Sequence, residues 1–187
     1  MPSQIIHLAI AKKYLEKHPG VIADEQAFID GNVLPDLNPD KAVSHCGIRK
    51  EMHDLVKRNK EKVNPEKFAE THDMTDPLNQ GQYLHLYVDD QYYNVLLVDY
   101  FRHISIPQSS TDMYETTRRD DAYLCEKYGV AYADSSLSSE LQLINDLWDN
   151  ERAKMRRQPD YKFNYAYTFS ILDQFIDEMS NVDIPQK

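Results

Sequence analysis

The chain has 187 residues, 41% of them hydrophobic and 28% charged, which fits one globular domain with a buried core. Its formal net charge of −10 disfavours nonspecific binding to nucleic acid, which needs a basic surface. With only five glycines, the sequence argues against a turn-rich β fold and against glycine-rich phosphate-binding loops.

Two cysteines, Cys46 and Cys125, cannot form a disulfide framework, so we expect free thiols in a reducing compartment. No segment reaches about 18 consecutive apolar residues, so no transmembrane helix is expected. Residues 1–4 have neither the basic region nor the apolar region of a signal peptide. These features predict a cytoplasmic protein.

Ser3 is placed to N-cap a first helix that runs to about Lys17 and ends at Pro19 and Gly20. His7 lies at the edge of the apolar stripe of this helix. A histidine there is either a structural residue at the edge of the core or a metal ligand. The stripe is formed by Ile6, Ile10 and Tyr14.

The next segment predicts a short helix that is capped by Asp24, continues through Asp30 and ends at Gly31. Residues 32–37 are expected to be non-helical, because Pro35 disfavours helical backbone at the residue before it. Asp36 then follows in a rigid loop. It is either a fixed ligand or a turn aspartate that caps the next element.

A helix is predicted over residues 48–60, and His45 lies just before it, where a side chain can point into a cleft. The dipeptide His53–Asp54 falls in the middle of this helix and is expected to be exposed. A short helix after Asn64 and a loop over residues 71–75 come next. Asp76 followed by a proline then predicts the start of a helix.

That helix is predicted from about residue 78 to residue 102, roughly 37 Å at 1.5 Å per residue, and would form the centre of a bundle. His85 and Asp89 lie one helical turn apart on the same face. A buried histidine and carboxylate must be paired, hydrogen-bonded or bound to a metal, because burial of a bare charge is costly. A structural hydrogen bond between them is the alternative to a metal site.

The C-terminal half is predicted to be helical over residues 112–180, and strand signals are almost absent from the whole chain. One helix spans residues 112–128 and is stopped by Gly129, with Asp121 as a possible buried carboxylate on its apolar face. A second helix begins at Ser138 or Ser139, and Asn164 caps the last. All seven histidines lie within the first 103 residues, so a histidine-based site must be built there.

Four short segments resemble, in chain order, the zinc-dependent phospholipase C family, whose fold is shared with P1/S1-type nucleases. They are residues 6–11 (IHLAIA), 28–36 (FIDGNVLPD), 44–45 (SH) and 81–89 (GQYLHLYVD). The resemblance covers about the first 95 residues. It implies a single all-α domain of the phospholipase C type over residues 1–187, with its metal-site motifs within residues 1–103.

Carried over by position, the resemblance implies that Asp36, His45, His85 and Asp89 surround one metal ion. Asp89 would bridge to a second ion that His7 also binds. In such families the ions polarise phosphate oxygens and activate water for attack on phosphorus. The residue at the position of Asp36 is the usual candidate for the general base.

The family pattern also contains a His-x-x-x-Glu pair on a later helix, whereas no histidine follows His103 here. We therefore expect one or two ions, with zinc favoured and manganese, iron or magnesium as alternatives. The roles of five further residues stay open at this stage: Asp30, His72, His103, Asp120 and Asp121.

These patterns favour a metal-dependent phosphoesterase that acts on a small phosphorylated substrate. An HD-type phosphohydrolase is the alternative suggested by the dipeptides His53–Asp54 and His72–Asp73. A non-catalytic helical protein with a structural or vestigial metal site is the third possibility, because the later ligands of the family are missing.

Overall fold

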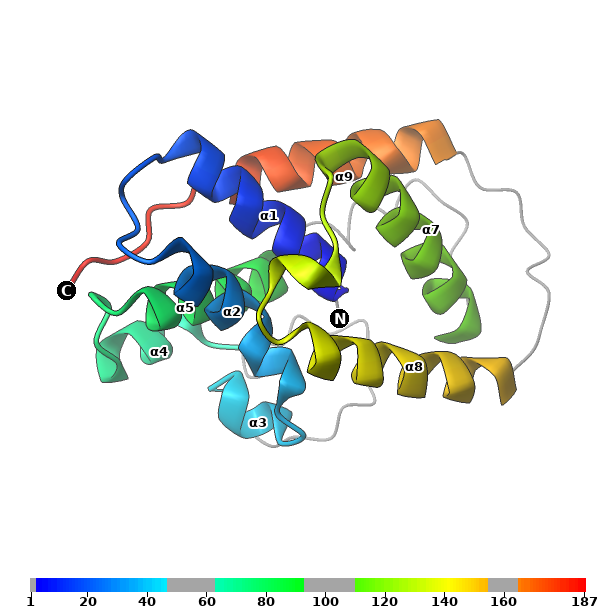
Figure 1. The fold of residues 1–187 in the computed structure, drawn as a ribbon, viewed down its shortest axis with the longest axis horizontal. Helices are drawn as coiled ribbons and strands as arrows, with labels where there is room; N and C mark the ends of the chain where they lie inside the picture. Colours follow the sequence, from blue (N-terminus) through cyan, green and yellow to red (C-terminus); the bar gives the residue numbers. More distant parts are fainter. Residues whose placement is uncertain (1–2, 47–62, 93–109, 155–164) are drawn as a thin grey trace.

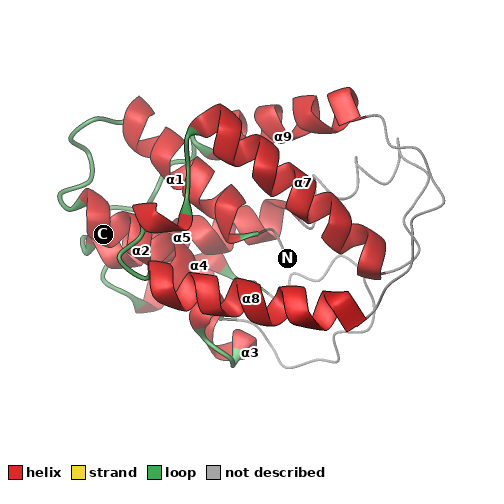
Figure 2. Cartoon of the chain, turned by 45° about the vertical axis from the view of Figure 1, so that its right-hand side comes forward, coloured by secondary structure: helices red, strands yellow, loops and turns green. Residues whose placement is uncertain are grey.

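The computed structural model describes residues 3–46, 63–92, 110–154 and 165–187, and these residues form helices and no strand (Figures 1 and 2). The prediction of an all-α, single-domain fold is confirmed at this level. The elements are α1 (Gln4–Lys17), α2 (Glu25–Leu37), α3 (Lys41–Ser44), α4 (Pro65–Thr71), α5 (Pro77–Gln91), α7 (Ser110–Tyr128), the 3₁₀ turn η2 (Tyr132–Asp134), α8 (Ser138–Lys154) and α9 (Tyr165–Met179).

Helix α1 occupies the middle of the described structure and contacts α2, α5, α7 and α9 (Figure 1). It begins where predicted, because the Ser3 side chain accepts a hydrogen bond of 3.3 Å from the amide of Ile6. It ends before Gly20, whose φ of 75° is readily available only to glycine. His7 lies inside the core and is fully buried, not at the edge of the apolar stripe.

The predicted break in α2 is wrong, because this helix continues through both Gly31 and Pro35. Gly31 serves helix packing: a Cβ atom there would lie 2.1 Å from the carbonyl oxygen of Leu78 on α5. Gly81 on α5 faces α2 in the same way. Pro35 removes one backbone donor near the end of the helix, a cost that packing against α5 outweighs. Asp36 is therefore a helical residue and does not lie in a loop.

Helix α5 starts as predicted, with Asp76 as its N-cap accepting a hydrogen bond of 3.0 Å from the amide of Leu78. It is described as far as Gln91, and its predicted extension to residue 102 lies outside the described residues. Other predictions also fall outside them: the helix over residues 48–60 with its dipeptide His53–Asp54, His103, and the cap Asn164. The long central helix therefore stays a prediction.

The C-terminal helices follow the prediction with two corrections. Helix α8 begins at Ser138, and the carbonyl of Leu137 accepts the hydrogen bond from the amide of Leu141, so neither Ser138 nor Ser139 is its cap. Asp120, not Asp121, is the buried carboxylate of α7. Helix α9 buries four apolar side chains, those of Leu172, Phe175, Ile176 and Met179.

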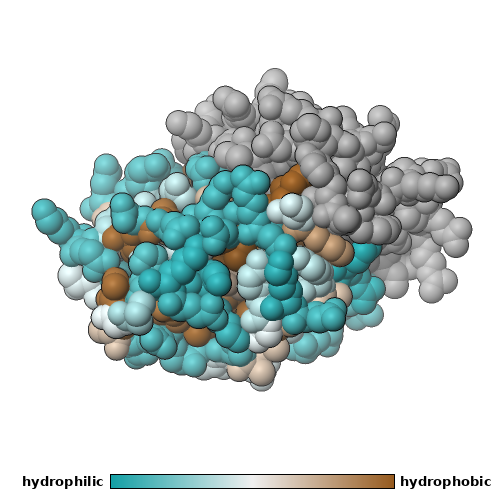
Figure 3. Space-filling view, turned by 90° about the horizontal axis from the view of Figure 1, so that it is seen from above, coloured by the Kyte–Doolittle hydropathy of each residue, from teal (hydrophilic) through white to brown (hydrophobic). Residues whose placement is uncertain are grey.

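The described residues on the face seen in Figure 3 are mostly hydrophilic, with small hydrophobic patches between polar side chains. Among the described residues, no helix has the length and apolar character needed to cross a membrane.

Candidate metal centre

All five residues predicted to bind metal come together in one buried cluster. His7 comes from α1, Asp36 from α2, His45 from the residue after α3, and His85 and Asp89 from α5. Their exposed fractions lie between 0% and 5%. Two triplets have ligand atoms within 4.8 Å of one another: His7, His85 and Asp89, and Asp36, His45 and His85. The cluster thus joins segments that are up to 82 positions apart in the sequence (89 − 7).

The carboxylate of Asp89 lies at the centre of the three imidazoles. Its Oδ1 is 3.4 Å from Nε2 of His7, and its Oδ2 is 3.2 Å from Nε2 of His45 and 3.9 Å from Nε2 of His85. The rings of His7 and His85 are stacked, with centroids 3.9 Å apart. Three ring nitrogens and both carboxylate oxygens therefore face the same small volume.

The protonation of His85 follows from its partner on α2. Its Nδ1 lies 2.8 Å from the backbone carbonyl oxygen of Asn32, which can only accept, so Nδ1 carries the proton. The other nitrogen of the neutral ring, Nε2, then presents a lone pair. It lies 3.3 Å from Nε2 of His45. His45 has an outer partner of its own, because its Nδ1 lies 2.8 Å from the hydroxyl of Ser44.

Several buried polar atoms of the cluster have no hydrogen-bond partner among the described residues. They are Nδ1 and Nε2 of His7 and Oδ1 of Asp89. Unpaired buried polar atoms are costly, and most are satisfied by protein, water or an ion. Nε2 of His7 and Oδ1 of Asp89 face each other at 3.4 Å, and a cation bound between them would satisfy both atoms.

Electrostatics in the cluster favour an anionic carboxylate beside a neutral imidazole. Burial opposes ionisation of Asp89, but the imidazoles of His45 and His7 more than offset it and hold its pKa well below the usual range. Burial, aided by the neighbouring His7, lowers the pKa of His85 to about 3. A proton on His85 therefore does not balance the charge of Asp89 near neutral pH, whereas a bound divalent cation would.

The local backbone explains how His45 reaches the cluster. The chain turns after His45, where Cys46 has a left-handed φ of 52°. The carbonyl of His45 accepts a hydrogen bond of 3.2 Å from the amide of Asn64 at the start of α4. On the other side of the cluster, Nε2 of Gln4 lies 3.5 Å from Oδ2 of Asp36.

Sequence reasoning missed Asn32 and Gln4 as neighbours of the ligands. Asn32 precedes Asp36 by four residues, a spacing that places both on one face of a helix. That signal was hidden because residues 32–37 were predicted to be non-helical. For Gln4 the sequence holds no comparable signal, because its contact with Asp36 depends on how α1 crosses α2.

Three of the residues whose roles were open, Asp30, Asp121 and His72, have other partners within the described structure. Asp30 accepts hydrogen bonds from Ser135 and Ser136 and so joins α2 to the start of α8. Asp121 accepts one from the hydroxyl of Ser3. The exposed His72 stacks on Phe68, with ring centroids 3.9 Å apart. Asp120 belongs to neither ligand triplet.

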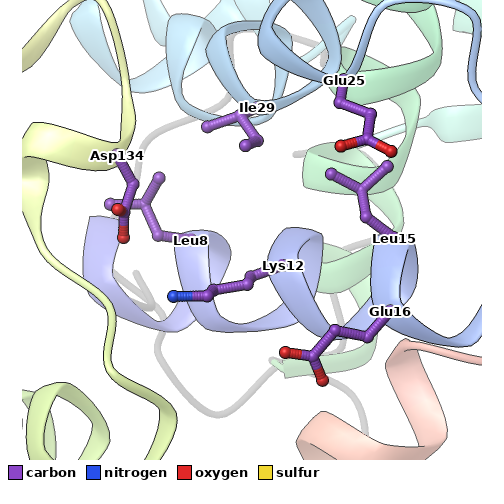
Figure 4. Close-up of a pocket in the computed structure, with 7 residues that line it drawn as sticks. All are labelled: Leu8, Lys12, Leu15, Glu16, Glu25, Ile29 and Asp134. Carbon is purple, nitrogen blue, oxygen red and sulfur yellow. The ribbon is translucent and has the colours of Figure 1, made fainter.

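A surface pocket of about 360 Å³ is lined by other residues (Figure 4). Lys12 extends across it, and its Nζ donates a hydrogen bond of 2.8 Å to the carbonyl of Gly129. None of the five cluster residues lines this pocket. Its lining residues are Leu8, Lys12, Leu15, Glu16, Glu25, Ile29 and Asp134.

Imidazole nitrogens and carboxylate oxygens are the donors that zinc takes in proteins, and two histidines with one carboxylate also suit iron and manganese. The donor set of the cluster therefore fits a transition-metal ion. Comparisons of the chain with models of protein families, with curated proteins and with solved structures gave no match. The geometry of the cluster is accordingly the basis on which a function can be assigned.

Proposed function

We propose that the protein is a metal-dependent phosphoric ester hydrolase, similar to the zinc-dependent phospholipase C family, that binds one or two zinc ions at the His/Asp cluster. One observation carries the proposal. Nε2 of His85, made a lone-pair donor by the hydrogen bond of Nδ1 to the Asn32 carbonyl, lies 3.3 Å from Nε2 of His45 and 3.9 Å from Asp89. A cation shared by this lone pair, Nε2 of His45 and the carboxylate would stabilise their close approach.

Each side chain has a definite task in this proposal. His45 and His85 present their Nε2 atoms, and Asp89 supplies the negative charge that balances a cation. His7 approaches the opposite carboxylate oxygen of Asp89, at 3.4 Å, where a second ion would be held. A bound zinc ion would polarise a phosphate ester and lower the pKa of a water molecule.

Asp36 is the candidate general base. It is the most exposed of the five residues, at 5%, and the half-buried Gln4 lies beside it. A carboxylate in this position can accept the proton of an attacking water molecule. Because the five ligands are so deeply buried, we expect a small phosphorylated substrate that presents its phosphate group at Asp36.

A structural metal site is the second candidate, and the same burial favours it. Structural zinc sites are closed, whereas catalytic ones keep an open position. An HD-type phosphohydrolase receives no support from His72 and Asp73, which are both exposed and belong to neither ligand triplet.

Elemental analysis of the purified protein tests the metal site. We expect stoichiometric zinc in the wild type, loss of zinc in His85→Ala, and retention in the control His72→Ala, which removes an exposed histidine. Absence of zinc, iron and manganese from the wild type after reconstitution would mean that the cluster is held by hydrogen bonds alone.

Hydrolysis of phosphomonoester and phosphodiester chromogenic substrates separates a catalytic site from a structural one. We expect turnover that requires zinc and falls by about 100-fold or more in Asp36→Asn, measured at saturating zinc. Tightly bound zinc without turnover on any ester would favour the structural site.

A further inference from the structure

We infer that Asn32 is a positioning residue for the metal ligand His85, which it holds through both its backbone carbonyl and its side-chain amide. The inference rests on the proposed metal function of the cluster. It assigns a specific task to a fully buried polar residue that is itself no ligand.

The first contact sets which nitrogen of His85 faces the cluster. The carbonyl oxygen of Asn32 lies 2.8 Å from Nδ1 of His85 and can only accept a hydrogen bond. The proton is thus held on Nδ1, and Nε2 is left to face Asp89 and His45. Partners of this kind fix the tautomer and ring orientation of histidines that bind metals.

The second contact fixes the helical turn on which His85 stands. Nδ2 of Asn32 donates a hydrogen bond of 3.2 Å to the carbonyl oxygen of Gly81. Gly81 precedes His85 by four residues, so its carbonyl is also the helical acceptor for the His85 amide. Asn32 therefore contacts this turn of α5 at both ends, once through the backbone and once through the side chain.

The packing of α2 on α5 brings Asn32 close enough to make both contacts. A Cβ atom at Gly81 would lie 2.8 Å from the backbone nitrogen of Asn32, so the two helices are in close backbone contact beside Asn32. Any side chain at Gly81 would push Asn32, and with it the acceptor for His85, away from α5.

The amide of Asn32 is not explained by its contribution to stability alone. Its Oδ1 is buried and has no hydrogen-bond partner among the described residues. An unpaired buried oxygen is unfavourable, so an apolar side chain of the same size would suit the core better. What the amide supplies is the hydrogen bond from Nδ2 that holds the turn of His85.

The test compares Asn32→Leu and Asn32→Ala with the control Gln80→Ala. Gln80 is also a buried amide, on α5, but its Nε2 donates to Gln186, at 3.2 Å, and not to a residue of the cluster. Zinc affinity is measured by competition with a chromophoric chelator. The tautomer of His85 is measured in metal-free protein by long-range ¹H–¹⁵N spectra, and thermal stability by the Tm.

In the wild type we expect a single His85 tautomer with its proton on Nδ1. Asn32→Leu keeps the backbone carbonyl but loses the bond from Nδ2 to Gly81, so the turn that carries His85 can move away from that carbonyl. It should therefore weaken zinc binding by about 10- to 100-fold and give a mixture of tautomers, while its Tm is kept or raised. Asn32→Ala should weaken zinc binding similarly and lower the Tm. Gln80→Ala should lower the Tm and leave zinc affinity and the His85 tautomer unchanged.

Wild-type zinc affinity together with a wild-type tautomer in Asn32→Leu would overturn the inference. So would an equal loss of zinc affinity in Gln80→Ala, because the effect would then be one of general destabilisation. A wild type that binds zinc but carries the His85 proton on Nε2 would overturn the inference and leave the metal function standing. A wild type that binds no metal would remove the proposed function, and the tautomer of metal-free protein would then decide alone whether Asn32 orients His85.

Discussion

Gly81 on α5 faces the carbonyl oxygen of Phe28 on α2 so closely that a Cβ atom at Gly81 would lie 2.1 Å from that oxygen. Backbone atoms cannot swing aside as a flexible side chain does, so Gly81→Ala must separate the two helices. We expect this variant to be destabilised by about 1–3 kcal/mol in urea unfolding, although alanine is the better helix former. Zinc affinity should fall as well, because His85 moves away from its partner on α2.

Gly20→Ala is the matched control for that variant. Nothing lies within 4 Å of a Cβ atom at Gly20, whose φ of 75° makes alanine unfavourable for the backbone alone. It should cost about 1–2 kcal/mol and leave zinc affinity unchanged. Gly81→Ala with wild-type stability and wild-type zinc affinity would show that the helices can separate without cost.

Sequence reasoning succeeded for features within one helix and failed for a glycine, Gly31, whose role depends on a second helix. The spacing of His85 and Asp89 placed both on one helical face, because that inference needs only the geometry of a single helix. The sequence predicts a helix end at Gly31, and this prediction fails because glycine both terminates helices and permits close packing between them. Only the partner helix distinguishes these two uses, and the contacted residue, Leu78, is 47 residues away in the sequence (78 − 31).

The identity of the cluster residues was also predictable. The set of five came from the resemblance to the zinc-dependent phospholipase C family, because the residues alone left each histidine and aspartate open between a ligand and a structural role. Asp36 was expected in a loop and lies on a helix, yet it reaches the same cluster. Outer partners such as Asn32 act through backbone atoms, which every residue has, and so leave little trace in the sequence.

Zinc should stabilise the folded protein, because the unfolded chain does not hold the five ligands together. A free zinc concentration 100 times the Kd should add about 2.7 kcal/mol to the free energy of unfolding, and a chelator should remove this gain. Differential scanning fluorimetry with and without zinc measures the effect. In Asp89→Asn the zinc-dependent increase in Tm should disappear, whatever the Tm of the metal-free variant.

Asp30→Asn is the comparison for Asp89→Asn. It also alters an aspartate with several partners, but these are Ser135 and Ser136 near the start of α8. Its Tm should fall while the zinc-dependent increase is retained. An equal loss of the zinc effect in both variants would indicate that zinc stabilises the protein at a different place.

Asp173 on α9 joins this helix to α7 through three donors. Its Oδ2 accepts from Tyr123, at 2.6 Å, and from Lys127, and its Oδ1 accepts from Tyr128, at 2.8 Å. Burial opposes ionisation of Asp173, but the hydrogen bonds from Lys127 and Tyr123 outweigh it and lower the pKa of Asp173. The ionised carboxylate therefore stabilises the folded protein above the pKa of the unfolded chain, and this stabilisation is lost as the pH falls through the pKa of the folded protein.

We expect Asp173→Ala to lower the free energy of unfolding by roughly 1–3 kcal/mol at neutral pH. Glu178→Ala on the exposed face of α9 should change it by less than about 0.5 kcal/mol. Urea unfolding measures both variants, and zinc affinity should be unchanged in each. A wild-type midpoint in Asp173→Ala would mean that the three bonds make no net contribution to stability.

Asp120 should make the folded protein less stable as the pH rises. Burial, aided by the neighbouring Asp121, raises the pKa of Asp120 from 3.8 to about 8. Between these two values the folded protein keeps a proton that the unfolded chain has lost, so the free energy of unfolding falls with increasing pH. Above about pH 8 the carboxyl group is ionised in both states, and its contribution no longer changes.

Asp120→Asn removes this dependence, because an amide does not ionise. In metal-free protein we expect the variant to be more stable than the wild type at pH 8, on the order of a few kcal/mol, with the difference shrinking towards pH 4. Urea unfolding at several pH values measures it. The control is Asp146→Asn, at an exposed position of α8. It also removes one negative charge from a chain of net charge −10 but does not remove a buried carboxyl group, so it shows how much of the effect is due to net charge alone. A constant difference between Asp120→Asn and the wild type from pH 4 to pH 8 would contradict a buried, protonated carboxyl group at this position.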